Sequence, residues 1–65
     1  MEYGKELLEF RAKHNLTQLA LSLIIGASVG MISQYETGHK SPTAKNKILF
    51  RNKMNEWEEK RNGKK

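Results

Sequence analysis

The sequence predicts an all-α fold, a small bundle of four or five helices in a single domain. Apolar residues recur at spacings of three and four along most of the 65 residues, and no stretch shows the period of two that strands require. Glycine, asparagine and proline fall between the periodic stretches. The chain has no cysteine, which excludes disulfides and thiolate metal sites, so a packed helical core or an oligomer interface must stabilise it.

The first predicted helix covers residues 4–14. Leu7, Leu8 and Phe10 lie on its adjoining turns and form an amphipathic stripe. Asn15 follows, and asparagine is the non-glycine residue that best enters the left-handed conformation at a helix end. We therefore expect this helix to end just before Asn15.

Two short helices are predicted next, with a turn at Gly26 between them. Thr17 can cap the first, because its hydroxyl accepts a hydrogen bond from a free N–H group at the helix start. Ser28 can cap the second, over roughly residues 29–36, in the same way. The apolar residues of the first are Leu21, Leu23, Ile24 and Ile25, and those expected to face inward from the second are Ile32 and Tyr35.

The last predicted helix begins at Ser41-Pro42 and runs to about residue 61. Proline suits the first helical position, where its missing N–H does no harm. Ile48 and Leu49 are expected to close the core. We expect a folded domain over residues 1–62 and a disordered basic tail over residues 63–65.

Phe50, Met54 and Trp57 recur at i, i+4 and i+7 and form one stripe on this last helix. The stripe has two interpretations. It either packs back on Leu7 and Leu8 of the first helix, because so small a core needs aromatic area, or it makes a dimer contact.

The net charge of +5 comes entirely from the C-terminal third. Residues 1–42 carry four cations and four glutamates, whereas residues 43–65 carry eight cations against three glutamates. A basic segment favours a polyanionic partner, although a solvated charged helix fits the charge equally well.

Residues 17–36 have the spacing of a helix-turn-helix, in which two helices joined by a short glycine turn cross steeply. The outer face of the second helix can then enter a major groove about 12 Å wide. A set of residues around this unit stands at a spacing typical of one family. They are Leu7, Phe10-Arg11, Leu16-Thr17-Gln18, Leu21, Ile25-Gly26, Ser28, Ile32-Ser33-Gln34-Tyr35-Glu36, Gly38 and Pro42.

At these positions the sequence resembles the phage-repressor and Cro-like helix-turn-helix domains. The resemblance implies a lambda-repressor-like fold with double-stranded DNA as the partner. That family usually has short fourth and fifth helices separated by a glycine, whereas no glycine interrupts residues 43–61 here. One longer last helix is therefore an alternative, and the usual dimer interface of the family is left open.

The resemblance also implies roles for individual residues. The residues expected to read bases are Val29, Gly30, Ser33 and Gln34. Those expected to contact phosphates are Gln18, Ser28, Thr37, His39 and Lys40. Gln34 is the strongest base reader, because a carboxamide can donate to and accept from adenine at once. Arg11 and Glu36 stand where the family has a structural ion pair. The alternative is a third helix that reads little sequence and a domain that contacts mainly phosphates.

The function that follows is a sequence-specific transcriptional regulator that occupies an operator, as a monomer or as a homodimer on DNA. The alternative is a protein-interaction module of the same fold, an antirepressor or antitoxin, that binds a protein partner. The chain has no aspartate, no cysteine and only two histidines, so we expect no enzyme, no metal and no cofactor. No apolar run reaches the ~18 residues of a membrane span, and no signal peptide is recognisable, so we expect a cytoplasmic protein without membrane association.

Overall fold

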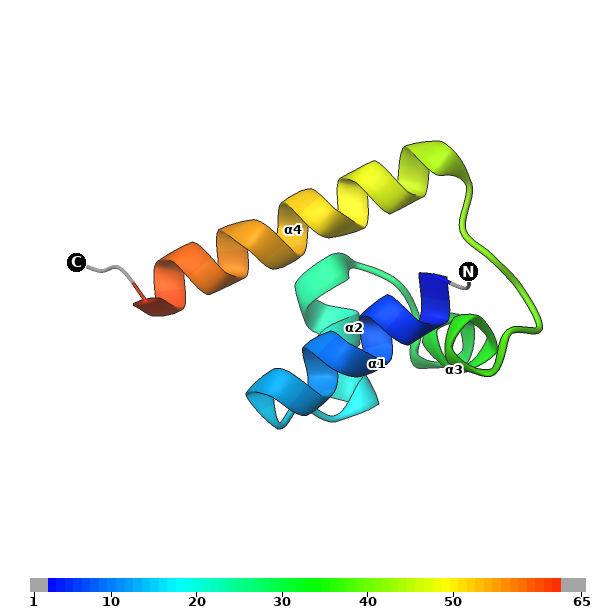
Figure 1. The fold of residues 1–65 in the computed structure, drawn as a ribbon, viewed down its shortest axis with the longest axis horizontal. Coiled ribbons are helices and arrows are strands. Elements are labelled where there is room, and N and C mark those ends of the chain that lie inside the picture. The colour runs from blue at the N-terminus through cyan, green and yellow to red at the C-terminus, as the bar shows by residue number, and fades with distance from the viewer. Residues whose placement is uncertain (1–2, 63–65) are drawn as a thin grey trace.

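The computed structural model describes residues 3–62, which form four helices and no strand (Figure 1). The helices are α1 (Tyr3–His14), α2 (Gln18–Ile25), α3 (Val29–Thr37) and α4 (Ala44–Asn62). The all-α prediction is confirmed. α4 is one uninterrupted helix of 19 residues, so the longer last helix replaces two short ones. The tail expected over residues 63–65 lies outside the described residues.

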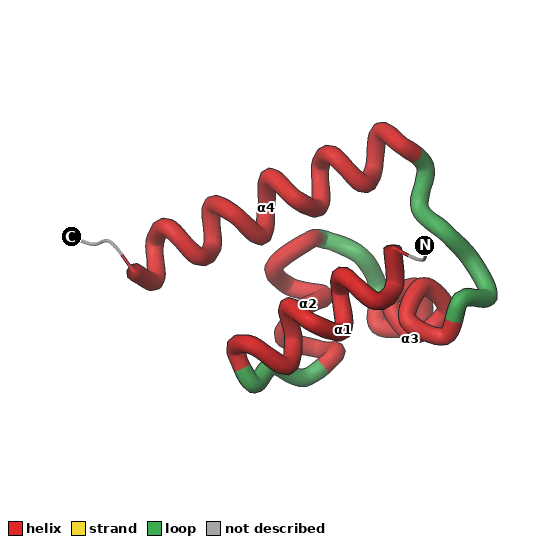
Figure 2. Tube along the Cα trace, in the orientation of Figure 1, coloured by secondary structure: helices red, strands yellow, loops and turns green. Residues whose placement is uncertain are grey.

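The first three helices form a compact unit, and α4 runs across one side of it (Figure 2). α1 packs mainly against α3, and α4 packs mainly against α2. α2 and α3 are joined by a short turn and are bent by 106° relative to each other. Among the described residues, no single helix is long and apolar enough to cross a membrane; α2 and α3 pass that test only as a bent pair.

Local signals set the limits of α1, α2 and α3 as predicted. Asn15 has a φ of 56°, and Gly26, after α2, has a φ of 79°. The Thr17 hydroxyl accepts a hydrogen bond from the backbone N–H of Ala20 at 3.0 Å, and Ser28 accepts one from Met31 at 3.1 Å. These side chains satisfy N–H groups that have no partner within their helices.

The predicted start of the last helix at Ser41-Pro42 is wrong. The helix begins at Ala44, and the hydroxyl of Thr43 caps it by accepting a hydrogen bond from the N–H of Asn46 at 3.2 Å. Pro42 is buried in the segment that connects α3 to α4. Residues 40–43 are not helical, because the chain there spans the distance from the end of α3 to the start of α4 (Figure 1).

Eight side chains form the core: Tyr3, Leu7, Leu21, Ile25, Ile32, Tyr35, Phe50 and Met54. Phe50 and Met54 are therefore used in intramolecular packing, and Trp57 is half-buried beside Phe10. Leu8 is exposed, so of the two leucines proposed as contacts for this stripe only Leu7 is in the core.

Two residues expected to close the core, and one further apolar residue of α2, are exposed. Ile48 and Leu49 are 61% and 46% exposed, because α4 turns the face of Phe50 and Met54 inward and each helical residue lies 100° from the next. Leu23 is 79% exposed. The core face of α2 is already occupied by its two buried residues, four positions apart.

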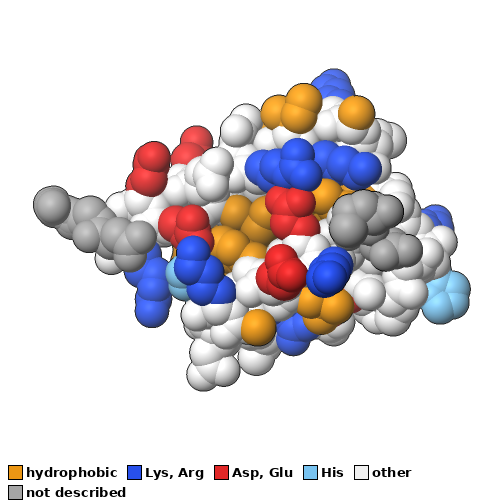
Figure 3. Space-filling model, viewed as in Figure 1, with side chains coloured by type: hydrophobic (Ala, Val, Ile, Leu, Met, Phe, Trp, Pro, Cys, Tyr) orange, Lys and Arg blue, Asp and Glu red, His pale blue; other side chains and the backbone are white. Residues whose placement is uncertain are grey.

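Ion pairs between side chains of α1 and α4 hold these two helices together. Figure 3 shows a face of the molecule on which apolar side chains lie between acidic and basic ones. Arg51 donates two hydrogen bonds of 2.8 Å to the carboxylate of Glu6. Further along, Glu58 lies 2.7 Å from His14 Nε2 and 3.3 Å from Lys13 Nζ. These pairs join α4 to α1.

Candidate nucleic-acid interface

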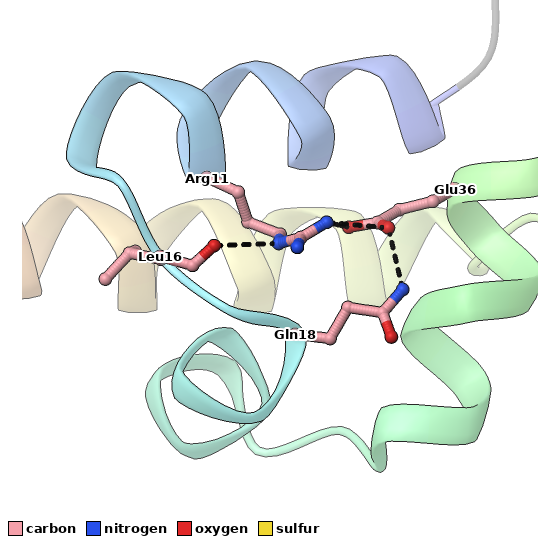
Figure 4. A network of polar contacts seen from close by, with 4 residues as sticks. All are labelled: Arg11, Leu16, Gln18 and Glu36. Carbon is pink, nitrogen blue, oxygen red and sulfur yellow. Dashed lines mark hydrogen bonds and ion pairs between the residues drawn. The ribbon is translucent and has the colours of Figure 1, made fainter.

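A polar network inside the domain ties α1 to α2 and α3 (Figure 4). Arg11 Nη1 donates to both carboxylate oxygens of Glu36, at 3.0 and 3.1 Å, and Arg11 Nε donates to the carbonyl of Leu16 at 3.1 Å. The side chains of Arg11 and Glu36 are only 23% and 6% exposed. A charge at this depth needs its partner, so the pair sets how α1 sits on α3.

Gln18 belongs to this network as well. Its side-chain Nε2 donates to Glu36 Oε1 at 3.0 Å, and the side chain is half-buried. One amide N–H therefore points into the protein, which leaves the second N–H and the backbone at the start of α2 for any phosphate. The sequence contained both residue types, but no local pattern indicated that they touch.

The outer face of α3 presents the residues predicted to read bases. Val29, Gly30 and Gln34 are exposed, and Ser33 is half-buried. Ser28 is exposed too, although its hydroxyl oxygen is occupied in capping the helix. The Ser28 hydroxyl can still donate its own hydrogen, so capping is compatible with a phosphate contact.

A shallow hollow of about 570 Å³ lies at the end of α3. Ser33 and Gln34 of α3 share the lining with Thr37, His39 and Lys40. The structure thus brings two predicted base readers and three predicted phosphate contacts onto one concave surface. Gln18, Ser28, Val29 and Gly30 lie outside that lining.

The loop after α3 is held rigidly beside Gln34. The carbonyl of Gln34 accepts hydrogen bonds from the backbone N–H groups of His39, at 2.9 Å, and Lys40, at 3.2 Å. Gly38, with a φ of 86°, reverses the chain so that these two N–H groups reach the end of α3. The Thr37 hydroxyl lies 2.8 Å from His39 Nδ1, which orients the imidazole.

The chemistry of this surface is that of hydrogen-bond donors and cations. The hollow is lined by two hydroxyls, an amide, an imidazole and an ammonium group, and by no carboxylate. Such a set suits a polyanion. Within residues 3–62, no three His, Cys, Asp or Glu side chains are placed to hold a metal ion.

The ionisable groups with shifted pKa values lie elsewhere, between α1 and α4. The hydrogen bonds from Arg51 hold the pKa of Glu6 below its usual range, and the hydrogen bond to His14 does the same for the pKa of Glu58. Burial, together with the nearby Glu6 charge, raises the pKa of Tyr3 to about 12. These pKa shifts concern the contacts between α1 and α4 and not the surface around α3.

Comparison with known proteins agrees with this geometry. The family model for helix-turn-helix domains matches residues 7–46, which is more than half of the chain and includes the whole of α2 and α3. Comparison with curated proteins and with solved structures found no match. The chain therefore belongs to the helix-turn-helix family of the Cro and phage-repressor type, a family of DNA-binding transcriptional regulators.

Proposed function

We propose that this protein binds double-stranded DNA with sequence preference and regulates transcription by occupying an operator. The observation that carries the proposal is the exposed face of α3 beside a surface of donors and cations without a carboxylate. α3 enters the major groove in this proposal, and the loop after it contacts the backbone of the flanking strand.

Gln34 is the main base reader in this proposal. Its side chain is exposed, and its backbone carbonyl accepts two hydrogen bonds from the following loop. These bonds hold in place the backbone that carries the side chain. A carboxamide that pairs with both N6 and N7 of adenine contributes about 1–3 kcal/mol of discrimination. Val29 adds an apolar contact to a thymine methyl group.

Gly30 allows the backbone of α3 to approach the DNA. A methyl group added at Gly30 would meet nothing closer than the Ser28 hydroxyl at 4.0 Å, so the fold does not require a glycine there. Glycine inside a helix costs about 1 kcal/mol relative to alanine. A close approach of another molecule to the backbone accounts for this cost.

Phosphate contacts come from both ends of the helix-turn-helix. Thr37, His39 and Lys40 contact phosphates of the strand next to the end of α3. Gln18 and Ser28 contact phosphates at the starts of α2 and α3. Two copies of the domain on half-sites about one helical turn apart would read a palindromic operator.

Selection of bound sequences from a random DNA pool tests the proposal. An enriched consensus supports sequence reading, and a palindromic one supports a dimer on DNA. A salt titration on random duplex DNA is the companion measurement, because phosphate contacts make log K fall linearly with log salt. No enrichment, together with no affinity at about 50 mM salt, would sink the proposal and favour a protein-interaction module.

A further inference from the structure

α2 is apolar on more faces than the core uses. Six of its eight residues are apolar and none is charged. Leu21 and Ile25 fill the core, whereas Leu19 and Leu23 on the outer side are 61% and 79% exposed. A helix that is apolar all round is normally covered on all sides, so the outer side of α2 lacks a covering element among residues 3–62.

A hollow of about 380 Å³ lies beside this side of α2, against the C-terminal half of α4. It is lined by Leu23, Ile24, Lys53, Glu56, Trp57 and Lys60. Ile24 and Trp57 are half-buried and form an apolar floor, and Leu23 stands at its edge. Edge-on contacts with Phe10 and His14 hold the Trp57 ring in place.

The charge around the hollow is mainly positive. Lys53 and Lys60 line it, and the guanidinium of Arg61 lies 5.2 Å from the centre of the Trp57 ring. Glu56 is the one acidic side chain in the lining. A second copy of this basic chain would bring like charges together here, whereas an acidic partner would complement them.

We propose that this hollow, which we call the α2–α4 groove, docks an amphipathic helix of another protein, with a row of apolar residues flanked by carboxylates. Apolar anchors at i, i+3 or i+4 and i+7 suit an apolar floor beside a helix, and acidic flanks suit the lysines. Of the stripe that the sequence suggested for a dimer contact, Phe50 and Met54 are in the core, whereas Trp57 lines this groove. The proposal does not depend on DNA binding, because none of the residues assigned to DNA lines the groove.

Trp57 makes the test direct, because it is the only tryptophan in the chain and lies in the groove. Tryptophan emission is followed while the full chain is titrated with a synthetic helical peptide of about 18 residues, with leucines on one face and glutamates beside them. A matched peptide carries lysine in place of each glutamate. We expect a saturable emission shift with the acidic peptide and at least tenfold weaker binding of the basic one, which is about 1.4 kcal/mol.

Two leucine variants distinguish binding in the groove from non-specific binding to exposed apolar side chains. Leu23→Ser should abolish the saturable shift, and Leu49→Ser, at another exposed leucine outside the groove, should leave it unchanged. Both side chains lie outside the core, and a melting curve for each variant verifies folding. Lys53→Glu combined with Lys60→Glu should reverse the preference between the two peptides.

Several results would overturn the proposal: no saturable shift, equal binding of the two peptides, or an unchanged response in Leu23→Ser. A dimer in sedimentation that dissociates in Leu23→Ser would assign the groove to a second copy instead. DNA affinity is measured on the same variants. A loss of DNA binding in Leu23→Ser would place the groove in the DNA interface, whereas failure of DNA binding in every variant, wild type included, would contradict the proposed function alone.

Discussion

Replacing Gly4 with alanine adds a methyl group where α1 meets the backbone of α3. A Cβ at this position would overlap the carbonyl oxygen of Tyr35 and would lie 2.6 Å from its carbonyl carbon and 2.8 Å from the Cα of Glu36. These are backbone atoms, so no side-chain rotation relieves the overlap. α1 must move away from α3, and the ion pair between Arg11 and Glu36 must stretch with it.

The size of the effect follows from this geometry. Glycine to alanine inside a helix normally stabilises by about 1 kcal/mol. Overpacking a core costs typically about 1–3 kcal/mol, and a rigid backbone neighbour places this site at the upper end. At roughly 0.05–0.15 kcal/mol per residue, a domain of this size has only about 3–10 kcal/mol of stability. A cost of about 3 kcal/mol less a gain of about 1 kcal/mol leaves an expected loss of about 2 kcal/mol in the free energy of unfolding of Gly4→Ala.

Urea unfolding followed by helical circular dichroism measures this change, as a lower midpoint at an unchanged slope. Gly30→Ala is the matched control, because the same methyl group in α3 meets nothing closer than 4.0 Å. That control should raise the free energy of unfolding by up to about 1 kcal/mol. If Gly4→Ala proved as stable as the wild type, the close approach of α1 to α3 would be refuted.

Four further outcomes are expected. Gln34→Ala should weaken binding to the selected site by about 1–3 kcal/mol and to random DNA hardly at all; equal losses would exclude base reading. Lys40→Ala should weaken both alike and reduce the slope of log K against log salt by about one, and an unchanged slope would remove Lys40 from the phosphate contacts. Glu36→Gln should lower the free energy of unfolding by about 2–4 kcal/mol, because it leaves Arg11 half-buried without its counter-charge; a change near zero in a urea titration would contradict this. The pKa of Glu58 is lowered in the folded state, so its contribution is present above the ordinary carboxyl pKa of 4.5 and is lost as pH falls through the lower folded value. The urea midpoint of Glu58→Gln should accordingly depend less on acid pH than that of the wild type, and parallel curves would refute the linkage.

Much of the candidate interface could be predicted because the helix-turn-helix is encoded locally. The exposed positions of Val29, Gly30 and Gln34 follow from the periodicity of one short helix with Ile32 and Tyr35 inside. The link between Gln18 and Glu36 could not be predicted in the same way. It joins two helices through a carboxylate that also serves Arg11, and only the crossing of α1, α2 and α3 brings the three side chains together.

Local sequence signals alone place the end of α1, both ends of α2 and the start of α3. Thr17, Ser28, Asn15 and Gly26 act on backbone groups within a few residues of themselves, so a local pattern is enough to place them. The lysine-rich charge of the C-terminal third and the resemblance to the family were equally visible in the printed chain.

Two features depend on the packing of the whole domain: which face of α4 points inward, and how closely α1 approaches α3. The stretch from Ile48 to Phe50 is apolar on several faces, so its pattern alone does not select the buried one. Packing against Tyr3 of α1 and Tyr35 of α3 selects Phe50 and leaves Ile48 exposed. Nothing in the local sequence around Gly4 requires a glycine; the requirement comes from the backbone of α3, which packs against it. Both outcomes depend on segments far apart in the chain, and their packing is a property of the whole domain.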